Sequence, residues 1–229
     1  MAGRKNFVAG EILTAADVNS FLMDQSVMVF DDSAARGSAI PTPSEGMVTY
    51  RKDDSRLEVF DGSSFGPVGT ILQVASTSVT SALSSSIAAR AFWDFGLSAS
   101  ITPVSATSQI LVRFEVTGTS RANDTVNFLP IRIVRGSTPV GVGDVAGDRS
   151  LVTSSVKQFI SGNQVGSVVN VSGAFLDSPN TTSATSYKAE FLNTSSNTEI
   201  LYINRGHTDT NDIGFERTIS TITLMEVAG

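Results

Sequence analysis

The sequence contains no cysteine, a single histidine and a single tryptophan among its 229 residues. Without cysteine, a disulfide scaffold, a zinc–thiolate site and a cysteine nucleophile are excluded. One histidine cannot build a multi-histidine metal site, and few schemes of general acid–base catalysis are left to it. The chain also has no G-x-S-x-G motif and no carboxylate pair placed as a glycosidase would need. We therefore predict a protein that is not an enzyme and has no cofactor and no metal.

Charged residues are scarce as well, at 17% of the chain, and the net charge is −6. Sequence-independent binding of nucleic acid needs a basic surface, which this composition does not supply. No uninterrupted apolar run reaches the roughly 18 residues that span a bilayer, and the first residues lack an apolar core of signal-peptide length. We expect a chain made in the cytoplasm that binds neither nucleic acid nor membrane.

Serine and threonine are abundant instead, with 32 and 23 copies. The acidic excess is concentrated in residues 1–70, which hold six basic and ten acidic side chains, whereas residues 71–229 hold ten and twelve. A surface made mainly of hydroxyls and amides is typical of β-rich structural proteins. The composition shift near Gly66–Gly69 predicts two domains, residues 1–66 and residues 67–229.

The first domain is predicted to begin with an amphipathic helix. Thr14 and Asp17 have the spacing of a capping box. Apolar residues follow at roughly helical spacing, which predicts a helix from about Ala15 to about Val29. Such a helix is marginal in water alone, so we assign its apolar stripe to assembly with other chains: Val18, Phe21, Leu22 and Val29.

A short helical turn and a β-hairpin are predicted next. Asp32 can cap a turn over Ala34–Arg36 that is ended by Gly37 and the prolines of Pro41–Pro43. The runs Glu45–Arg51 and Arg56–Gly62 flank a charged turn and predict two paired strands. Each strand offers one apolar face, and the hairpin must pack on a helix, on the next domain or on another chain through these residues: Val48, Tyr50, Leu57 and Val59.

The second domain is predicted to be an antiparallel β-sandwich of jelly-roll-like type, which makes the chain mainly β. Apolar residues alternate there with polar ones, and polar segments separate the runs. A Ser/Thr-rich stretch, Ser76–Ser86, reads as an extended strand and loop. Closure as a jelly roll or as another Greek-key sandwich stays open. The predicted strands are Ile71–Ala75, Ala91–Phe95, Gln109–Thr117, Phe128–Arg135, Val140–Val142, Ser167–Phe175, Tyr187–Leu192, Glu199–Asn204 and Ile219–Glu226.

Three segments carry residues that often serve chemistry. His207 stands near Asp209 and Asp212, which suggests a general base, a calcium loop without the EF-hand pattern, or simply a polar loop. The segment Gly141–Gly147 contains G-x-G but lacks the following helix of a dinucleotide site, so it reads as a turn. Trp93 lies in an aromatic cluster that suits either a core strand or a stacking platform for a sugar. We keep Trp93 and His207 as candidates for surface contact.

Several segments resemble bacteriophage virion structural proteins of the minor tail and tail fibre type. The resemblance covers most of the chain. Members of this group are labelled minor tail, tail fibre or head decoration proteins, so the position on the particle stays open. The segments that carry it are Phe7–Asn19, Glu45–Phe65, Ile101–Val112, Phe175–Lys188, Tyr202–Arg205 and Ile219–Glu226.

The resemblance implies a virion component that forms a homotrimer and has no catalytic residues. Residues 1–66 would then attach the trimer to other virion proteins, and the β-domain would point outward and contact the host surface. One alternative is a head fibre or capsid decoration protein that stabilises the capsid. A second is a receptor-recognition adhesin that binds a host cell-surface glycan.

Overall fold

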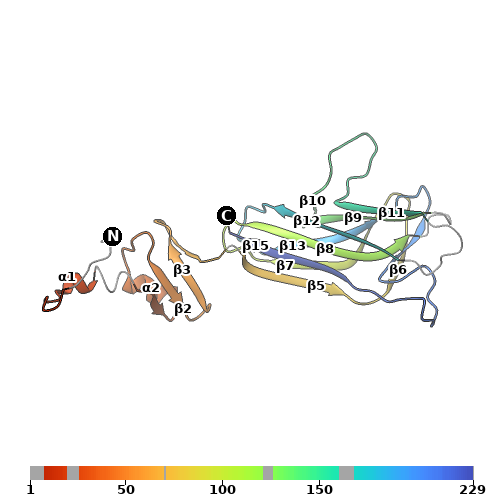
Figure 1. The fold of residues 1–229 in the computed structure, drawn as a ribbon. Coiled ribbons are helices and arrows are strands. Elements are labelled where there is room, and N and C mark those ends of the chain that lie inside the picture. The colour runs from red at the N-terminus through yellow and green to blue at the C-terminus, as the bar shows by residue number, and fades with distance from the viewer. Residues whose placement is uncertain (1–7, 20–25, 70, 121–125, 160–167, 229) are drawn as a thin grey trace. The chain divides into compact units, whose positions relative to one another are not determined.

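The chain is mainly β, with 49% of its residues in strands and 6% in helices, as the sequence predicts. Its contacts divide it into two compact units, residues 1–70 and residues 71–229. Figure 1 shows the elements of each unit. The computed structural model describes residues 8–19, 26–69, 71–120, 126–159 and 168–228.

The described part of the first unit contains two short helices and a four-stranded sheet in the order β1-β2-β3-β4. β1 runs parallel to β2, and the two other strand pairs are antiparallel. The predicted hairpin is confirmed as β2 and β3, to which β1 and β4 add one strand on each side. The elements are α1 (Ala15–Val18), β1 (Met28–Phe30), α2 (Ser33–Ala39), β2 (Val48–Arg51), β3 (Arg56–Phe60) and β4 (Phe65–Pro67).

Both helices begin as the sequence predicts. The Thr14 hydroxyl accepts a hydrogen bond from the Asp17 N–H at 3.1 Å, and the Asp17 carboxylate accepts one from the Thr14 N–H at 3.2 Å. The Asp32 carboxylate accepts from the Ala35 N–H at 2.7 Å and caps α2. α2 continues through Gly37 and ends at Ala39, just before the predicted stop at Pro41–Pro43, so Gly37 does not end it.

The predicted helix over residues 15–29 is wrong at its C-terminal end, because Met28 and Val29 lie in a strand. α1 is a single turn that ends at Val18, which is half-buried. Val29 lies in strand β1, where it pairs with Tyr50 of β2. Phe21 and Leu22 fall outside the described residues. A valine between a methionine and a phenylalanine suits a strand better than an exposed helix end, and pairing with β2 gives its backbone partners that an isolated helix lacks.

The second unit consists of two antiparallel sheets, which include the strand orders β5-β15-β8-β14-β6 and β10-β9-β13-β7. β12 joins the first sheet through β8, and β11 joins the second through β9. The strands are β5 (Ile71–Val79), β6 (Leu83–Ile87), β7 (Phe92–Ile101), β8 (Gln109–Ser120), β9 (Val126–Arg135), β10 (Thr138–Val140), β11 (Ser154–Phe159), β12 (Val169–Asp177), β13 (Thr185–Leu192), β14 (Glu199–Ile203) and β15 (Ser220–Val227).

In three cases, two of these strands are the halves of one longer strand that is interrupted by a connecting segment. β14 and β15 both pair with the edge of β8 that lies opposite β12. β6 and β5 continue along β14 and β15 in the same way, and β10 and β11 share one edge of β9. When each pair is counted once, the described part of each sheet has four strands.

The order of these eight strands is that of a jelly roll. Numbered along the chain, the first, eighth, third and sixth strands form one sheet, and the second, seventh, fourth and fifth form the other. Every described strand pair in this unit is antiparallel. Two Greek keys in two sheets define the jelly roll, which resolves the alternative that the sequence leaves open.

The core lies between the two sheets, and the predicted alternation places its residues there. Along β8, every second side chain from Ile110 to Val116 is at most 1% exposed, and β9 and β15 contribute matching rows from both sheets. Gly173 of β12 leaves room for Phe114, because a Cβ atom at this glycine would lie 2.8 Å from the ring. The rows include Ile110, Val112, Phe114, Val116, Leu129, Ile131, Ile133, Ile222 and Leu224.

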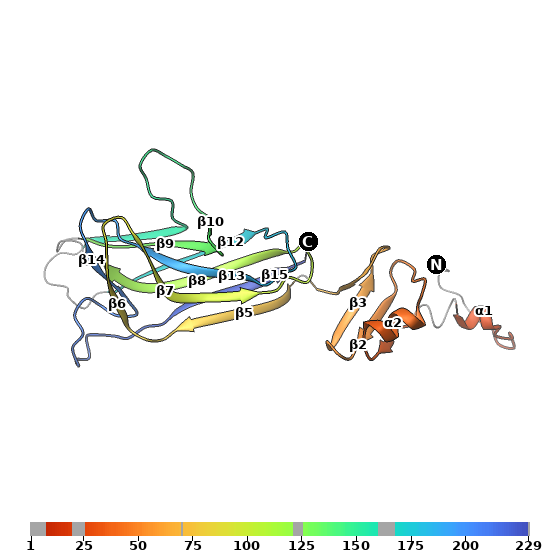
Figure 2. The same cartoon turned by 180° about the vertical axis from the view of Figure 1, so that it is seen from behind.

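Two long loops leave the sandwich at the interruptions, residues 204–219 between β14 and β15 and residues 141–153 between β10 and β11. The second projects away from the sheets in Figures 1 and 2. Asn204, which is fully buried with a φ of 58°, closes the first gap. Its amide donates to the carbonyl oxygens of Val79 at 2.7 Å and Ser81 at 3.1 Å, and its oxygen accepts from the Ser220 hydroxyl at 2.7 Å.

We expect the substitution Asn204→Ala to lower the free energy of unfolding by about 2–4 kcal/mol, because it removes the hydrogen bonds to the Val79 and Ser81 carbonyls and leaves the buried Ser220 hydroxyl without its acceptor. Chemical denaturation followed through the fluorescence of Trp93, which lies in the sandwich, measures this change. Asn180→Ala is the matched control, since Asn180 is exposed and has a similar φ of 53°. Equal losses in the two variants would mean that backbone strain alone explains the effect.

Candidate assembly surface

Within its strand bounds, one face of the N-terminal sheet is apolar, and it is partly exposed among the residues that the structure describes. Residues directly opposite each other in a sheet share a face, and the registers of β1 to β4 bring two rows together. Val68 joins the face just after β4, because its N–H donates to the Leu57 carbonyl at 3.0 Å. We call this the open face, and it consists of Val29, Val48, Tyr50, Leu57, Val59, Gly66 and Val68.

The open face is partly exposed to solvent. Val29 is 56% exposed, Val68 54% and Leu57 39%, and its other members are half-buried. A contiguous apolar group on a sheet face is uncommon on a monomeric surface and marks an interaction site when large. The sequence predicts that the hairpin residues share one face, and the structure brings them together there.

Helix α2 covers the opposite face of this sheet. Glu58, which is 3% exposed, accepts hydrogen bonds there from the guanidinium groups of Arg36 and Arg51. The Arg36 guanidinium also stacks over the Phe65 ring, 4.1 Å from its centroid. Thr49, on the same face, is fully buried. Helix α2 therefore does not pack on the apolar hairpin residues.

The sequence does not predict this arrangement. Glu58 and Arg51 stand on the polar side of the hairpin, where an exposed pair is the ordinary expectation. The cation from α2 has no sequence signal, because Arg36 lies 22 positions before Glu58. Only the register of β2 and β3 could have shown that Arg51 and Glu58 point to the same side.

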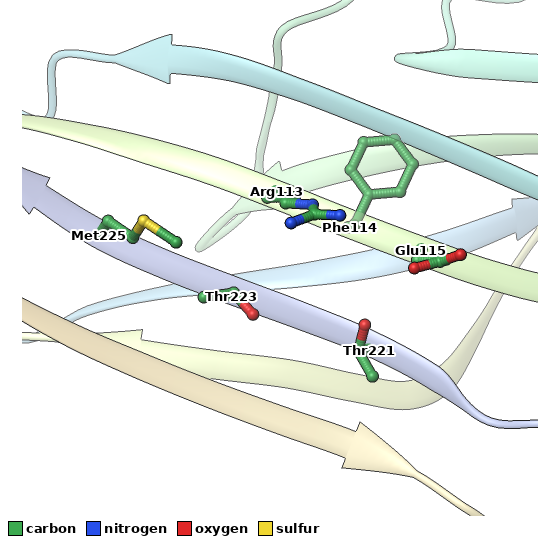
Figure 3. A pocket seen from close by; sticks show the side chains of 6 residues that line it. All are labelled: Arg113, Phe114, Glu115, Thr221, Thr223 and Met225. Atoms are coloured by element: carbon green, nitrogen blue, oxygen red, sulfur yellow. The ribbon is translucent and has the colours of Figure 1, made fainter.

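A shallow hollow of about 220 Å³ lies on the outer face of the sheet that contains β8 and β15. Figure 3 shows its side chains side by side along these two strands. They offer a guanidinium, a carboxylate and two hydroxyls but no imidazole that could activate a hydroxyl as a nucleophile. The lining residues are Arg113, Phe114, Glu115, Thr221, Thr223 and Met225.

The outer face of the other sheet carries a ladder of ion pairs. Glu190 accepts from Arg132 at 2.5 Å and lies 3.0 Å from the Lys188 ammonium, which also donates to Asp94 at 2.9 Å. Burial alone would raise the pKa of Asp94, but hydrogen bonds from Lys188 and from the Gly96 N–H outweigh it and lower the pKa. These charges are mutually satisfied, and the ladder is a structural feature of the sheet.

His207 lies half-buried in the loop between β14 and β15. Its ring meets the Tyr202 ring edge-on at a centroid distance of 5.5 Å. Asp209 pairs with Arg205 and Arg217, and Asp212 accepts from the Gly214 N–H at 3.0 Å. The two carboxylates therefore brace the loop, and within the described residues no three His, Asp or Glu side chains gather as a metal site requires.

Trp93 lies near the start of β7 and faces inward. It is half-buried, packs against the core cluster and lies 5.9 Å from the Phe95 ring between centroids. The interpretation as a core strand therefore fits, whereas the candidate role of Trp93 in surface contact has no exposed platform to support it. The G-x-G segment lies in the loop between β10 and β11 and has no helix after it.

No protein-family model matches this chain, and no curated protein matches it either. Among solved structures, the chain is similar to part of the structure of infectious bursal disease virus Gt strain, with 14% identity, a TM-score of 0.34 and coverage of 87% of this chain. The crystal structure of the infectious bursal disease virus VP2 subviral particle gives 15% identity, a TM-score of 0.29 and coverage of 74% of this chain.

This chain spans about half the length of the first of these viral chains, 54%, and 41% of the other. Identities and TM-scores this low do not show a shared function or a common overall fold. Among the described residues, no helix has both the length and the apolar character needed to cross a membrane.

We expect Glu58→Ala to destabilise the N-terminal unit by about 2–3 kcal/mol, because it leaves the guanidinium groups of Arg36 and Arg51 without their shared carboxylate. Asp31→Ala is the control. It removes an ion pair with Lys52 in which both side chains are exposed, and such a pair contributes less than about 1 kcal/mol. Hydrogen exchange of the β2 and β3 amides measures both variants. Equal protection in the two would contradict the importance of the buried pair.

Proposed function

We propose that this chain is a non-enzymatic structural protein of a bacteriophage virion, a minor tail or tail fibre component. It forms a homotrimer and attaches to the particle through its N-terminal unit. The jelly roll points outward and is the part that contacts the host surface.

The observation that carries this proposal is the contrast between the two units. The sandwich has a core of its own, with more than a dozen side chains less than 2% exposed. The N-terminal sheet instead leaves the open face partly exposed among the described residues, and a further partner would bury it. A chain with a self-sufficient domain and a partner-seeking one suits assembly.

The sequence resemblance adds the kind of assembly, because the segments that resemble phage tail and fibre proteins occur in both units. Jelly rolls themselves occur in viral capsid proteins, lectins and cupins. A fold that is shared so widely does not choose a function.

A receptor-binding role is the second candidate, and the loop at residues 204–219 favours it. This loop is longer than most connections in compact domains, and long loops with little secondary structure often serve binding. Ile213, near its tip, is fully exposed. A glycan array and a binding assay with host cells test this role, and the absence of saturable binding in both would exclude it.

Light scattering on the purified chain tests the trimer. At micromolar concentration, we expect a molecular mass three times the chain mass of 24.1 kDa. A single-chain mass would contradict the homotrimer.

Deleting residues 1–70 tests the attachment. We expect the remaining sandwich to stay folded, because its core lies within residues 71–229, and to be absent from assembled particles. The full-length chain is the control, and imaging of labelled particles distinguishes the tail from the head. Incorporation of the truncated chain would place the attachment in the sandwich instead.

A further inference from the structure

We propose that three copies of this chain pack their open faces against one another around a three-fold axis. This inference rests on the proposed homotrimer and names the surface that forms it. The N-terminal sheets would form the sides of a triangular prism, and the open faces would form its interior. Helix α2 would lie on the outside of each side, because it covers the opposite face of the sheet.

Charge favours a second copy over other surfaces of the same chain. The strands of the open face carry no charged side chain within their described bounds on that side. The outer face of the sheet of β8 and β15 carries Arg113 and Glu115, and the outer face of the other sheet carries the ion-pair ladder of Arg132 and Glu190.

Covering the open face with either of these surfaces would bury charges against apolar groups, which costs several kcal/mol for each ion. The open face of another copy avoids that cost, since its strands carry no charged side chain on that side within their bounds. Identical patches that meet around a closed symmetry axis are also the usual way in which homo-oligomers form. The chemistry of the open face therefore favours packing against the open faces of other copies of the chain.

The dimensions of the sheet suit three copies. A sheet of four strands is about 19 Å wide, because neighbouring strands lie about 4.8 Å apart. Three such sheets arranged as an equilateral triangle lie about 5.5 Å from the common axis. Packed sheets lie about 10 Å apart, so side chains reach about 5 Å from each sheet. The side chains of three open faces would therefore fill the prism without a central hole.

The register identifies the residues nearest to the axis. The middle of the sheet falls between β2 and β3, where Tyr50 and Leu57 are directly opposite each other. Val29 and Val68 lie at the two edges of the same row and would meet neighbouring copies at the corners of the prism. Leu57 is therefore the best position for a disruptive charge and for a cross-link.

The first test is the mass of the full-length variant Leu57→Glu by light scattering. We expect the three-chain mass of the natural sequence to fall to that of one chain, because three carboxylates would be buried together near the axis. Leu176→Glu is the matched control, since Leu176 is also an exposed leucine on a strand, at 53%, but lies in the sandwich. This control is expected to keep the three-chain mass.

A second variant covers the case in which Leu57→Glu unfolds its own unit. The chain has no cysteine, so Leu57→Cys introduces a single thiol near the axis. Mild oxidation is expected to link two chains of each trimer, whereas Leu176→Cys is expected to give no such link. Circular dichroism checks that each variant is folded.

The outcomes separate this inference from the proposed function. A trimer that survives Leu57→Glu and gives no cross-link through Leu57→Cys overturns the open face as the interface and leaves the homotrimer in place. A single-chain mass for the natural sequence overturns both the interface and the homotrimer. A dimer in place of a trimer overturns the three-fold arrangement.

Discussion

The hydrogen-bond ladder along β8 is the constraint on which the sandwich depends, because β8 lies inside its sheet and must be paired on both edges. One edge is complete, since β12 follows it from Ile110 to Gly118. The other is interrupted by the loop that begins at Asn204. The Asn204 N–H donates to the Thr117 carbonyl at 2.8 Å, and the Thr117 N–H donates to the Ser220 hydroxyl at 3.1 Å. Both main-chain groups of Thr117 therefore keep partners, and the loop leaves the sheet without opening the core.

The same solution recurs on β9, and it gives part of the hydroxyl-rich composition a structural purpose. The Thr153 hydroxyl accepts from the Ile133 N–H at 2.9 Å and donates to the Val140 carbonyl at 3.2 Å, while the Thr153 N–H donates to the Ile131 carbonyl at 2.8 Å. A short polar side chain can replace a backbone group at an interruption, which an apolar side chain cannot do. Chains that insert loops into strands need such residues at each return point.

Sequence patterns predicted the strands in which apolar and polar residues clearly alternate. They failed for strands that are defined only by backbone hydrogen bonds to their neighbours. The runs of β8 and β15 were evident because a buried face of Val, Ile, Leu and Phe alternates with a polar one. β6 was placed only as part of an extended Ser/Thr-rich stretch, and β11 was missed, because strands rich in serine carry little periodicity. The predicted strand Val140–Val142 ends instead at Val140, where Gly141 turns with a φ of 59°. Bridging residues such as Asn204 cannot be recognised before the register is known.

In the N-terminal unit, the sequence pattern predicted only part of the assembly surface. The alternation of Val48, Tyr50, Leu57 and Val59 predicted one apolar face, but it could not say which face α2 would cover. The helix is short and presents Arg36, and a guanidinium gains more from Glu58 and the Phe65 ring than from a row of aliphatic side chains. The polar face of the hairpin is therefore the one that its own unit buries. The apolar face stays available because the helix is better satisfied elsewhere, and the chain keeps an uncharged surface within its more acidic part.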